Sequence, residues 1–508
     1  MDFLPNFSVE TWALLVVLVT VFFLYGSWTH EIFRKLGIPG PRPLPFIGTF
    51  HEYRKGMLEF DMKCFKKYGK MWGIFDGRTP ILVVMDPVIL KSILVKECYT
   101  HFTNRRPIGL NGPFEEGMSV AKDDEWKRIR TVLSPTFTSG RLKEMFPIMK
   151  SLGETLVKNV QKKTEHDEPL DMKQLFGSYS TDVVISTSFG VNVDSMNNPN
   201  DPFVTIARKM FNFRFINPLL TIIVLFPFLT PILKKLNDWL SPNDLVQFFT
   251  RAIKSLKEKR QKGNHEKRVD FLQLMVDSQT EDTSSSNGTH HGYKALTDSE
   301  IIAQSRVFIL AGYETTSTTL SFLSYNLATH PDVQRKLQQE IDTLLPNKAP
   351  PTYEALLQME YLEMAINEAL RLYPAGGRIE RVCKKTVEVK GVTIPEGVVV
   401  VIPLYSLHRD PEYWPEPDKF NPDRFTKENK ETQEPYTFLP FGSGPRNCIA
   451  MRFALLNVKV GIVSLLQNFS FQVCKETPIP LELDTRGFVQ PKTPIYLKLV
   501  PRTATRVR

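Results

Sequence analysis

The residues best suited to chemistry lie in one loop near the C-terminus, residues 440–448, whose sequence is PFGSGPRNC. Its glycines and prolines favour a rigid loop over a strand or a helix. The loop ends in Cys448, which precedes an amphipathic helix predicted from Ile449 to about Leu466. The helix dipole and nearby backbone N–H groups stabilise a thiolate at such a position. Cys448 is therefore predicted to be ionised, as either a nucleophile or a metal ligand.

Two observations favour the metal ligand. A nucleophilic cysteine needs a histidine close by, and the nearest one in the sequence, His408, belongs to a different segment. The loop glycines also let a flat group approach the backbone, which fits the single axial thiolate of a haem iron. A disulfide framework or a zinc module is not expected, because the other cysteines are far apart and form no C-x-x-C pair: Cys64, Cys98, Cys383 and Cys474.

A long predicted helix carries a second group of candidate residues. Residues 297–300 have the form of a capping box, and a helical pattern runs from there to about Ala328, before Pro331. This is roughly twice the ordinary helix length, so the helix should cross the whole domain. Its middle reads AGYETT, residues 311–316, where two small residues precede an acid and two hydroxyls.

Pairs of residues at helical spacing form a third group. Glu368 and Arg371 share one helix face at i, i+3, and Trp126 and Arg130 share another at i, i+4. Any helix surface can supply such a pair, so each is weak evidence by itself. The pairs gain specificity only in combination with the cysteine loop.

In combination and in this order, the motifs resemble those of the cytochrome P-450 monooxygenases. The loop resembles the haem-binding pattern F-x-x-G-x-R-x-C, and residues 421–425 (NPDRF) resemble the P-x-R-F segment of that family. The resemblance covers the full length of the chain. It implies a mostly α fold with minor β structure, in which a long central helix lies over the haem, with a small β-rich lobe and an N-terminal transmembrane helix.

The resemblance also implies roles for single residues. Cys448 would be the axial ligand of haem b. The residues in contact with the haem or its propionates would be Arg105, Trp126, Arg130, Arg381, Phe441, Gly444, Arg446 and Cys448. Thr315 and Glu314 would be catalytic, because cleavage of the O–O bond requires delivered protons. Arg424 would complete a structural ion-pair cluster with Glu368 and Arg371.

The implied substrate pocket is expected to be unusual. Its candidate lining residues are Ser119, Phe213, Phe215, Phe308, Ala311, Gly376 and Phe488. Four stretches resemble the mammalian drug-metabolising family 3, subfamily A: residues 102–107, 134–140, 466–471 and 474–481. The sequence departs from that subfamily at pocket positions that are smaller or less aromatic: Ile108, Leu310, Gly376 and Gly377. Ala450 replaces a glycine that is usual two residues after the ligand cysteine, and we expect haem to bind with a shifted spectrum or potential.

The implied reaction inserts one oxygen atom of O2 into lipophilic substrates such as steroids and drugs. The chain contains no G-x-G-x-x-G or flavin fingerprint, so electrons from NADPH must arrive through a separate NADPH-cytochrome P-450 reductase. Cytochrome b5 is a second partner that the resemblance allows. The reductase would dock on basic residues that are otherwise simply solvated: Lys91, Lys96, Lys127 and Arg128.

The charge balance agrees with partners of this kind. Lys+Arg 64 against Asp+Glu 55 gives a net charge of +9, spread over 508 residues without a dense basic tract. This favours anionic lipid or an acidic protein over nucleic acid.

The N-terminus is predicted to be an uncleaved membrane anchor, in preference to a cleaved signal or a buried helix. Residues 12–28 contain no charge and have Trp12 and Trp28 at their edges, while Arg34 and Lys35 follow. The expected location is the endoplasmic reticulum membrane, with the catalytic part in the cytosol. The predicted domains are an anchor at 1–30, a proline-rich connector at 31–50 and a haem-binding catalytic domain at 51–508.

Two further interpretations remain open in the sequence. Residues 203–240 are rich in Phe and interrupted by prolines, so they form either core or an apolar lid that contacts lipid and lines a channel. The chain could also be a haem-thiolate isomerase or dehydratase, or a haem sensor. Glu314 and Thr315 argue against both, because neither activity needs a proton relay.

Overall fold

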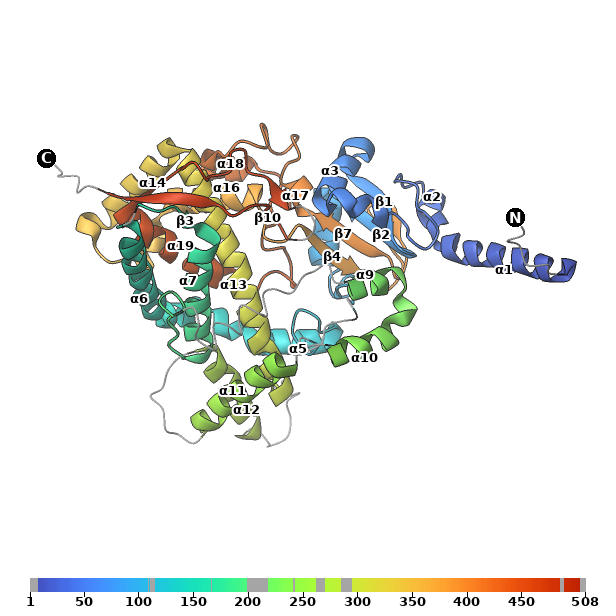
Figure 1. Cartoon of the computed structure of the whole chain (residues 1–508), viewed down its shortest axis with the longest axis horizontal. Coiled ribbons are helices and arrows are strands. Elements are labelled where there is room, and N and C mark those ends of the chain that lie inside the picture. Colours follow the sequence, from blue (N-terminus) through green and yellow to red (C-terminus); the bar gives the residue numbers. More distant parts are fainter. Residues whose placement is uncertain are drawn as a thin grey trace, which may run out of the picture.

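The structure is a computed structural model that describes residues 8–107, 109, 115–165, 167–198, 218–240, 243–261, 270–284, 295–484 and 488–502. The described chain is mostly helical with small sheets, which confirms the predicted fold class. Figure 1 shows the helices gathered around the long helix α13 (Asp298–Thr329), with a β-rich lobe between them and the N-terminal helix.

The helices of the described chain fall into four groups along the sequence. The first comprises α1 (Val9–Ser27), α2 (Ile32–Lys35), α3 (Met57–Tyr68) and α4 (Pro87–Lys91). The second comprises α5 (Asp123–Leu133), α6 (Ser139–Thr164) and α7 (Met172–Phe189). The third comprises α9 (Pro218–Leu225), α10 (Thr230–Leu240), α11 (Asn243–Gln261), α12 (Phe271–Ser284) and α13 (Asp298–Thr329). The fourth comprises α14 (Pro331–Leu344), α15 (Tyr353–Gln358), α16 (Glu360–Leu372), α17 (Leu404–Leu407), α18 (Lys427–Thr432) and α19 (Met451–Asn468).

The main sheet has the strand order β1-β2-β7-β4. Its strands are β1 (Met71–Asp76), β2 (Thr79–Val84), β7 (Val399–Pro403) and β4 (Arg378–Val382). The first two form a hairpin around a turn at Gly77-Arg78, with Trp72 opposite Val83. The other sheets are β3-β11-β8, β5-β6 and β10-β9, with β3 (Leu170–Asp171), β5 (Val387–Val389), β6 (Val392–Ile394), β8 (Phe469–Gln472), β9 (Leu483–Asp484), β10 (Gln490–Pro491) and β11 (Tyr496–Pro501).

The central helix α13 is 32 residues long and begins with the predicted capping box. Thr297 Oγ1 accepts a hydrogen bond from Glu300 N at 3.2 Å, and Thr297 N donates to Glu300 Oε2 at 2.8 Å. The helix ends before Pro331, which cannot continue it. Because α7, α16 and α19 pack against it, α13 fixes the position of the residues in its middle.

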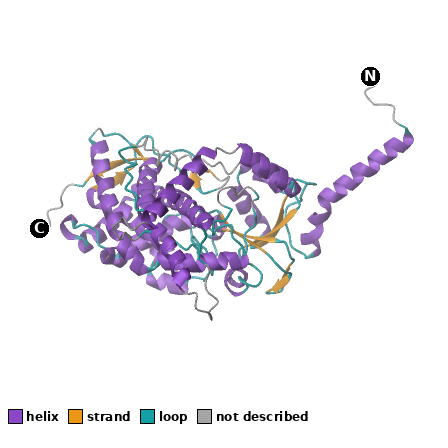
Figure 2. Cartoon of the chain, turned by 90° about the horizontal axis from the view of Figure 1, so that it is seen from below, coloured by secondary structure: helices purple, strands orange, loops and turns teal. Residues whose placement is uncertain are grey.

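Helix α1 is the apolar helix predicted as an anchor. It lies almost free of the body and is long and apolar enough to cross a membrane (Figure 2). Its end is nevertheless docked, because Thr29 Oγ1 donates to Arg78 O at 2.8 Å and Phe46 N donates to Gly26 O at 3.1 Å. The contact is so close at Gly26 that a Cβ there would overlap the Phe46 ring. Helix α1 is thus held against the β-rich lobe by packing as well as by the chain that follows it.

The described part of residues 203–240 lies on the surface. It comprises α9, a short 3₁₀ turn at Pro227–Leu229 and α10. Four large apolar side chains are exposed on it: Ile222, Phe228, Ile232 and Leu236. Phe226 packs near Phe46, with ring centroids 6.4 Å apart. This segment therefore forms an apolar surface next to α1, and its role as a lid stays a prediction.

Candidate functional site

The cysteine loop is closed by its own backbone. Cys448 N donates to Phe441 O at 2.8 Å, and Asn447 N donates to Gly444 O at 3.0 Å. Gly442 and Gly444 have φ values of 71° and 73°, which favour glycine over residues with a side chain. The loop thus presents the sulfur of Cys448 at a fixed point before α19.

The two loop glycines face different neighbours. Gly442 lines a cavity beside Cys448. Gly444 instead lies against Leu94, whose carbonyl oxygen a Cβ would overlap. Gly444 thus packs the loop against residues 92–96 and does not line the cavity, so its implied contact with the haem stays a prediction.

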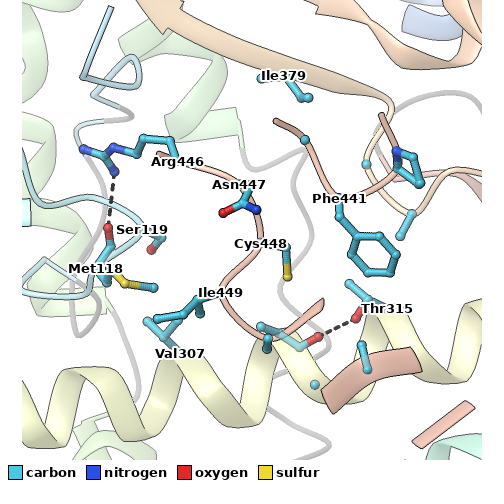
Figure 3. Close-up of a pocket in the computed structure, with 18 of the residues that line it drawn as sticks. Met118, Ser119, Val307, Thr315, Ile379, Phe441, Arg446, Asn447, Cys448 and Ile449 are labelled. Carbon is cyan, nitrogen blue, oxygen red and sulfur yellow. Dashed lines mark hydrogen bonds between the residues drawn. The ribbon is translucent and has the colours of Figure 1, made fainter. Parts of the chain in front are cut away.

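The cavity has a volume of about 620 Å³ and lies between the cysteine loop and α13. Figure 3 shows the Cys448 sulfur pointing into this space, with Thr315 on the helix below it. It brings together most of the predicted site residues, namely Arg105, Ser119, Trp126, Arg130, Phe308, Ala311, Thr315, Gly376, Arg381, Phe441, Arg446, Cys448 and Phe488. Most of its wall is apolar, so lipophilic ligands can fill it.

Small residues shape the side of α13 that meets the cavity. Thr315 Oγ1 donates to Ala311 O at 2.7 Å within the helix (Figure 3). Gly312 serves a second purpose, because a Cβ there would overlap Val184 of α7. Ser180 Oγ also donates to Gly312 O at 2.8 Å. Gly312 therefore permits the close crossing of α7 as well as an open cavity.

Glu314 does not line the cavity with Thr315. Its Oε1 accepts hydrogen bonds at 2.7 Å from Lys173 Nζ on α7 and at 2.7 Å from Gln490 Nε2 on β10. Thr318 Oγ1 donates to the same oxygen at 3.3 Å. Sequence reasoning missed Lys173 and Gln490, because residues so far apart along the chain leave no local pattern.

Six arginines line the cavity, and the pKa of four of them is lowered. Burial and the neighbouring guanidinium groups lower the pKa of Arg446 to about 9 and that of Arg381 to about 10. Burial also lowers the pKa of Arg105 and Arg130. The Nε atoms of Arg381 and Arg446 are buried without a hydrogen-bond partner among the described residues. This concentration of desolvated positive charge fits a ligand with carboxylates.

Helix α5 connects the arginines to the cysteine loop. Arg130 donates to Asn447 O and to Asn447 Oδ1, both at 2.8 Å. The Arg446 guanidinium lies 4.3 Å from the centre of the Trp126 ring. Trp126 and Arg130 thus both contact the loop that carries the sulfur.

These residues suit a haem: one sulfur for the iron, an apolar cavity for the porphyrin, and arginines for two propionates. No cluster of three or more His, Cys, Asp or Glu side chains that could hold a metal occurs among the described residues. Burial raises the pKa of Cys448, and the Ala450 N–H, Arg130 and Arg105 oppose the shift only in part. The ionised state of Cys448 therefore stays a prediction for the site with its iron bound. The charge of a bound iron would supply the missing stabilisation.

The predicted ion-pair cluster assembles behind the site. Arg371 Nε and Nη2 donate to the Glu368 carboxylate at 2.7 and 2.8 Å, and both side chains are fully buried. Arg371 Nη1 donates to His408 O at 2.8 Å, and Arg424 Nε lies 3.3 Å from Glu368 Oε1. The cluster joins α16 to the segment that leads into the cysteine loop.

Some predicted residues lie elsewhere. Phe213, Phe215 and Ile108 fall outside the described residues. Arg128 forms an ion pair with Glu300 at the start of α13, so it is engaged in a structural contact. Three further charged residues line the cavity that the sequence did not single out: Arg106, Arg378 and Glu380. Arg106 Nη2 pairs with Glu380 Oε1 at 2.9 Å.

The fold and the site define a haem-thiolate enzyme, and comparisons with known proteins place it more closely. The family described as Cytochrome P450 matches residues 38–499. Cytochrome P450 3A12 of Canis lupus familiaris is 57% identical over 502 residues, with 99% of each chain covered. Cytochrome P450 3A29 of Sus scrofa is 57% identical and cytochrome P450 3A9 of Rattus norvegicus 56% identical, each over 505 residues and 99% of both chains. The chain belongs to the cytochrome P450 family, and it is similar to the 3A members of that family.

Proposed function

We propose that this protein inserts one oxygen atom of O2 into bulky lipophilic molecules, such as steroids and drugs, with electrons from NADPH delivered by a separate reductase. The observation that carries this proposal is the cavity itself. It places the Cys448 sulfur on one wall, Thr315 on the facing helix and four desolvated arginines along the rim. The haem that fits there supplies a redox-active iron for O2 activation, to which the thiolate donates electron density.

The residues of the chain perform the other tasks. Cys448 would hold the iron, and Arg105, Arg130, Arg381 and Arg446 would bind the propionates. The hydroxyl of Thr315 stands at the cavity surface, where it holds a proton at Oγ1 close to the reacting centre. Apolar cavity walls exclude water and orient the substrate.

Glu314 is proposed to bring protons to Thr315 from solvent. Its side chain is about 20% exposed and its partner Lys173 about 27%, so the pair is in contact with water. The carboxylate must leave Lys173 and Gln490 before it can reach the cavity, because both hold the same oxygen, Oε1.

The setting of the enzyme is proposed to be the endoplasmic reticulum membrane. Residues 1–30 would be the anchor, residues 31–50 the connector and residues 51–508 the cytosolic catalytic domain. The exposed apolar residues of α9 and α10 would contact the lipid. The side chains of Lys91, Lys96 and Lys127 are exposed, so they remain available to an acidic reductase surface or to cytochrome b5.

Reconstitution tests the proposed function. Purified protein, reductase and vesicles receive NADPH and a steroid, and product is measured against NADPH consumed. We expect stoichiometric hydroxylated product and a haem-thiolate absorption band in the reduced CO complex. Cys448→Ala should lose both, whereas Cys474→Ala, a partly exposed cysteine remote from the cavity, should lose neither. Product formation without NADPH would instead indicate an isomerase or dehydratase.

A further inference from the structure

One part of the cavity wall has no regular structure to hold it. Residues 115–121, here called the wall segment, line the cavity through Met118, Ser119 and Val120. The internal bonds that the segment makes are turns, in which Val120 N and Ala121 N donate to Gly117 O at 2.9 and 3.0 Å. A segment outside helices and sheets needs partners for its remaining backbone groups. Its shape therefore depends on side chains from other elements.

Gln304 of α13 supplies two of these partners. Its Oε1 accepts a hydrogen bond from Met118 N at 2.8 Å, and its Nε2 donates to Glu116 O at 2.8 Å. The side chain is fully buried, so both halves of the amide are used where water cannot replace them. Because one half accepts and the other donates, only one orientation of the amide satisfies both contacts.

The other contacts to the wall segment involve charged groups. Arg446 donates to Ala121 O at 2.6 Å and to Met118 O at 3.3 Å, the latter drawn in Figure 3. Lys234 of α10 pairs with Glu115 at 2.8 Å. Arg446 also belongs to the proposed haem site, so changing it would disturb the cofactor as well. Gln304 is neutral and does not line the cavity, which makes its contribution separable.

We propose that Gln304 is a positioning residue for substrate specificity. It fixes the distance between the wall segment and α13, where Val307 and Phe308 line the cavity one turn further along the helix. Ser119 is then the hydroxyl that this wall presents to a bulky lipophilic substrate. Without Gln304, the N–H of Met118 and the carbonyl of Glu116 lose their partner, and the wall segment populates other shapes. The apparent affinity for a bulky ligand falls in proportion to the population of the competent shape.

The test compares Gln304→Leu with a matched control, Gln334→Leu. Gln334 is also a buried glutamine whose amide both accepts and donates hydrogen bonds to the backbone. Its Oε1 accepts from Phe471 N at 2.7 Å, and its Nε2 donates to Phe471 O at 3.0 Å. It lies on α14 and does not line the cavity. Both variants should lose similar stability, so a merely structural effect would appear in both.

We expect Gln304→Leu to weaken binding of a bulky steroid about tenfold, measured by the substrate-induced spectral shift, because two buried hydrogen bonds are lost. Amide exchange of residues 115–121 should rise by a similar factor, and the ratio of hydroxylated products should change. The reduced CO band should persist. Gln304→Glu keeps the acceptor for Met118 N and, as the neutral acid that burial favours, a donor for Glu116 O, so it should show smaller effects. Gln334→Leu should show none.

Unchanged affinity, exchange and product ratio in folded Gln304→Leu would overturn the proposal. If Gln304→Leu does not accumulate as folded protein, the same measurements on Gln304→Glu and the amide exchange of the unmodified protein test the proposal. A Met118 amide that exchanges in the unmodified protein as fast as a free amide would equally reject it. The choice of substrate rests on the proposed function, but the exchange arm needs no turnover. If the unmodified protein showed no turnover, that result would therefore count against the proposed function. The amide-exchange measurement would still test the role of Gln304.

Discussion

At the scale of single residues, the site depends on groups that are costly to bury without a partner. Burial and repulsion between neighbouring guanidinium groups lower the pKa of Arg381 and Arg446 in the cavity wall. Burial also raises the pKa of the Cys448 thiol. Both shifts are relieved by a ligand that brings an iron and two carboxylates. The residues are thus complementary to a group with those charges.

Replacement of Thr315 by alanine should uncouple electron use from product. The variant keeps the fold and the haem, because the hydroxyl bonds only within its own helix at Ala311 O in the described structure. Product per NADPH should fall about tenfold and hydrogen peroxide should rise, since a proton donor at Oγ1 is lost. Thr319→Ala is the control, because Thr319 also lines the cavity and bonds within α13. Unchanged coupling in Thr315→Ala would refute the relay.

His408 should make the protein sensitive to acid. It is fully buried, and its Nε2 accepts a hydrogen bond from Leu439 N at 2.9 Å, just before the cysteine loop. Burial and the charges of Arg371 and Arg409 lower its pKa from 6.5 to about 3. As the pH falls, His408 therefore takes up a proton in the unfolded chain at a higher pH than in the folded protein. The stability that the neutral ring contributes is complete above pH 6.5 and is lost as the pH falls toward 3.

Urea denaturation at a series of pH values measures this effect. The free energy of unfolding should fall below pH 6.5 by up to about 1.4 kcal/mol per pH unit through this group. His408→Gln should remove that part of the slope, while His51→Gln, whose side chain is 37% exposed, should leave it. An identical slope in His408→Gln would show that other groups account for the acid sensitivity.

At the scale of elements, the buried ion-pair cluster joins α16 to the segment that enters the cysteine loop. Arg371 bonds three backbone carbonyls of that segment, those of His408, Pro417 and Lys419, in addition to Glu368. The cluster is thus a joint between elements, and its energetic importance lies in the cost of leaving one charge alone. This cost sets it apart from ion pairs of the same spacing on a helix surface.

Arg371→Met should destabilise the protein by about 3–5 kcal/mol, because Glu368 stays buried without its main partner. Arg141→Met is a matched control, since Arg141 and Glu144 have the same i, i+3 spacing on an exposed face of α6. That change should cost at most about 0.5 kcal/mol. Denaturant titration of both variants measures the difference, and equal losses would contradict the assigned role.

At the scale of the whole molecule, the apolar helix α1, the β-rich lobe and the apolar surface of α9 and α10 lie together at one end (Figure 1). The cavity is linked to this end through Lys234 and Glu115. A lipophilic substrate dissolved in the membrane would therefore meet the wall of the cavity first. The arrangement predicts two separate contributions to membrane binding.

Removal of residues 1–20 should convert integral attachment into reversible binding and leave the reduced CO spectrum unchanged. The shortened chain should still sediment with vesicles. The double change Phe228→Ser and Ile232→Ser should then weaken binding about tenfold or more, because two exposed apolar side chains are lost. Leu357→Ser is the control, an exposed leucine on α15. Equal binding of all three shortened proteins would exclude the second contact.

The sequence by itself determined the local features: the cysteine loop, the capped central helix, the hairpin and the apolar N-terminal helix. Each of these is encoded by neighbouring residues, through glycine conformations, capping and hydrophobic period. Only the tertiary structure decided which distant residues the side chains contact. It turned Glu314 toward Lys173 and Gln490, turned Gly444 toward Leu94, and attached Gln304 to the cavity wall. These contacts join residues far apart in the chain, where packing and the need to satisfy buried polar groups decide the outcome and local spacing carries no signal.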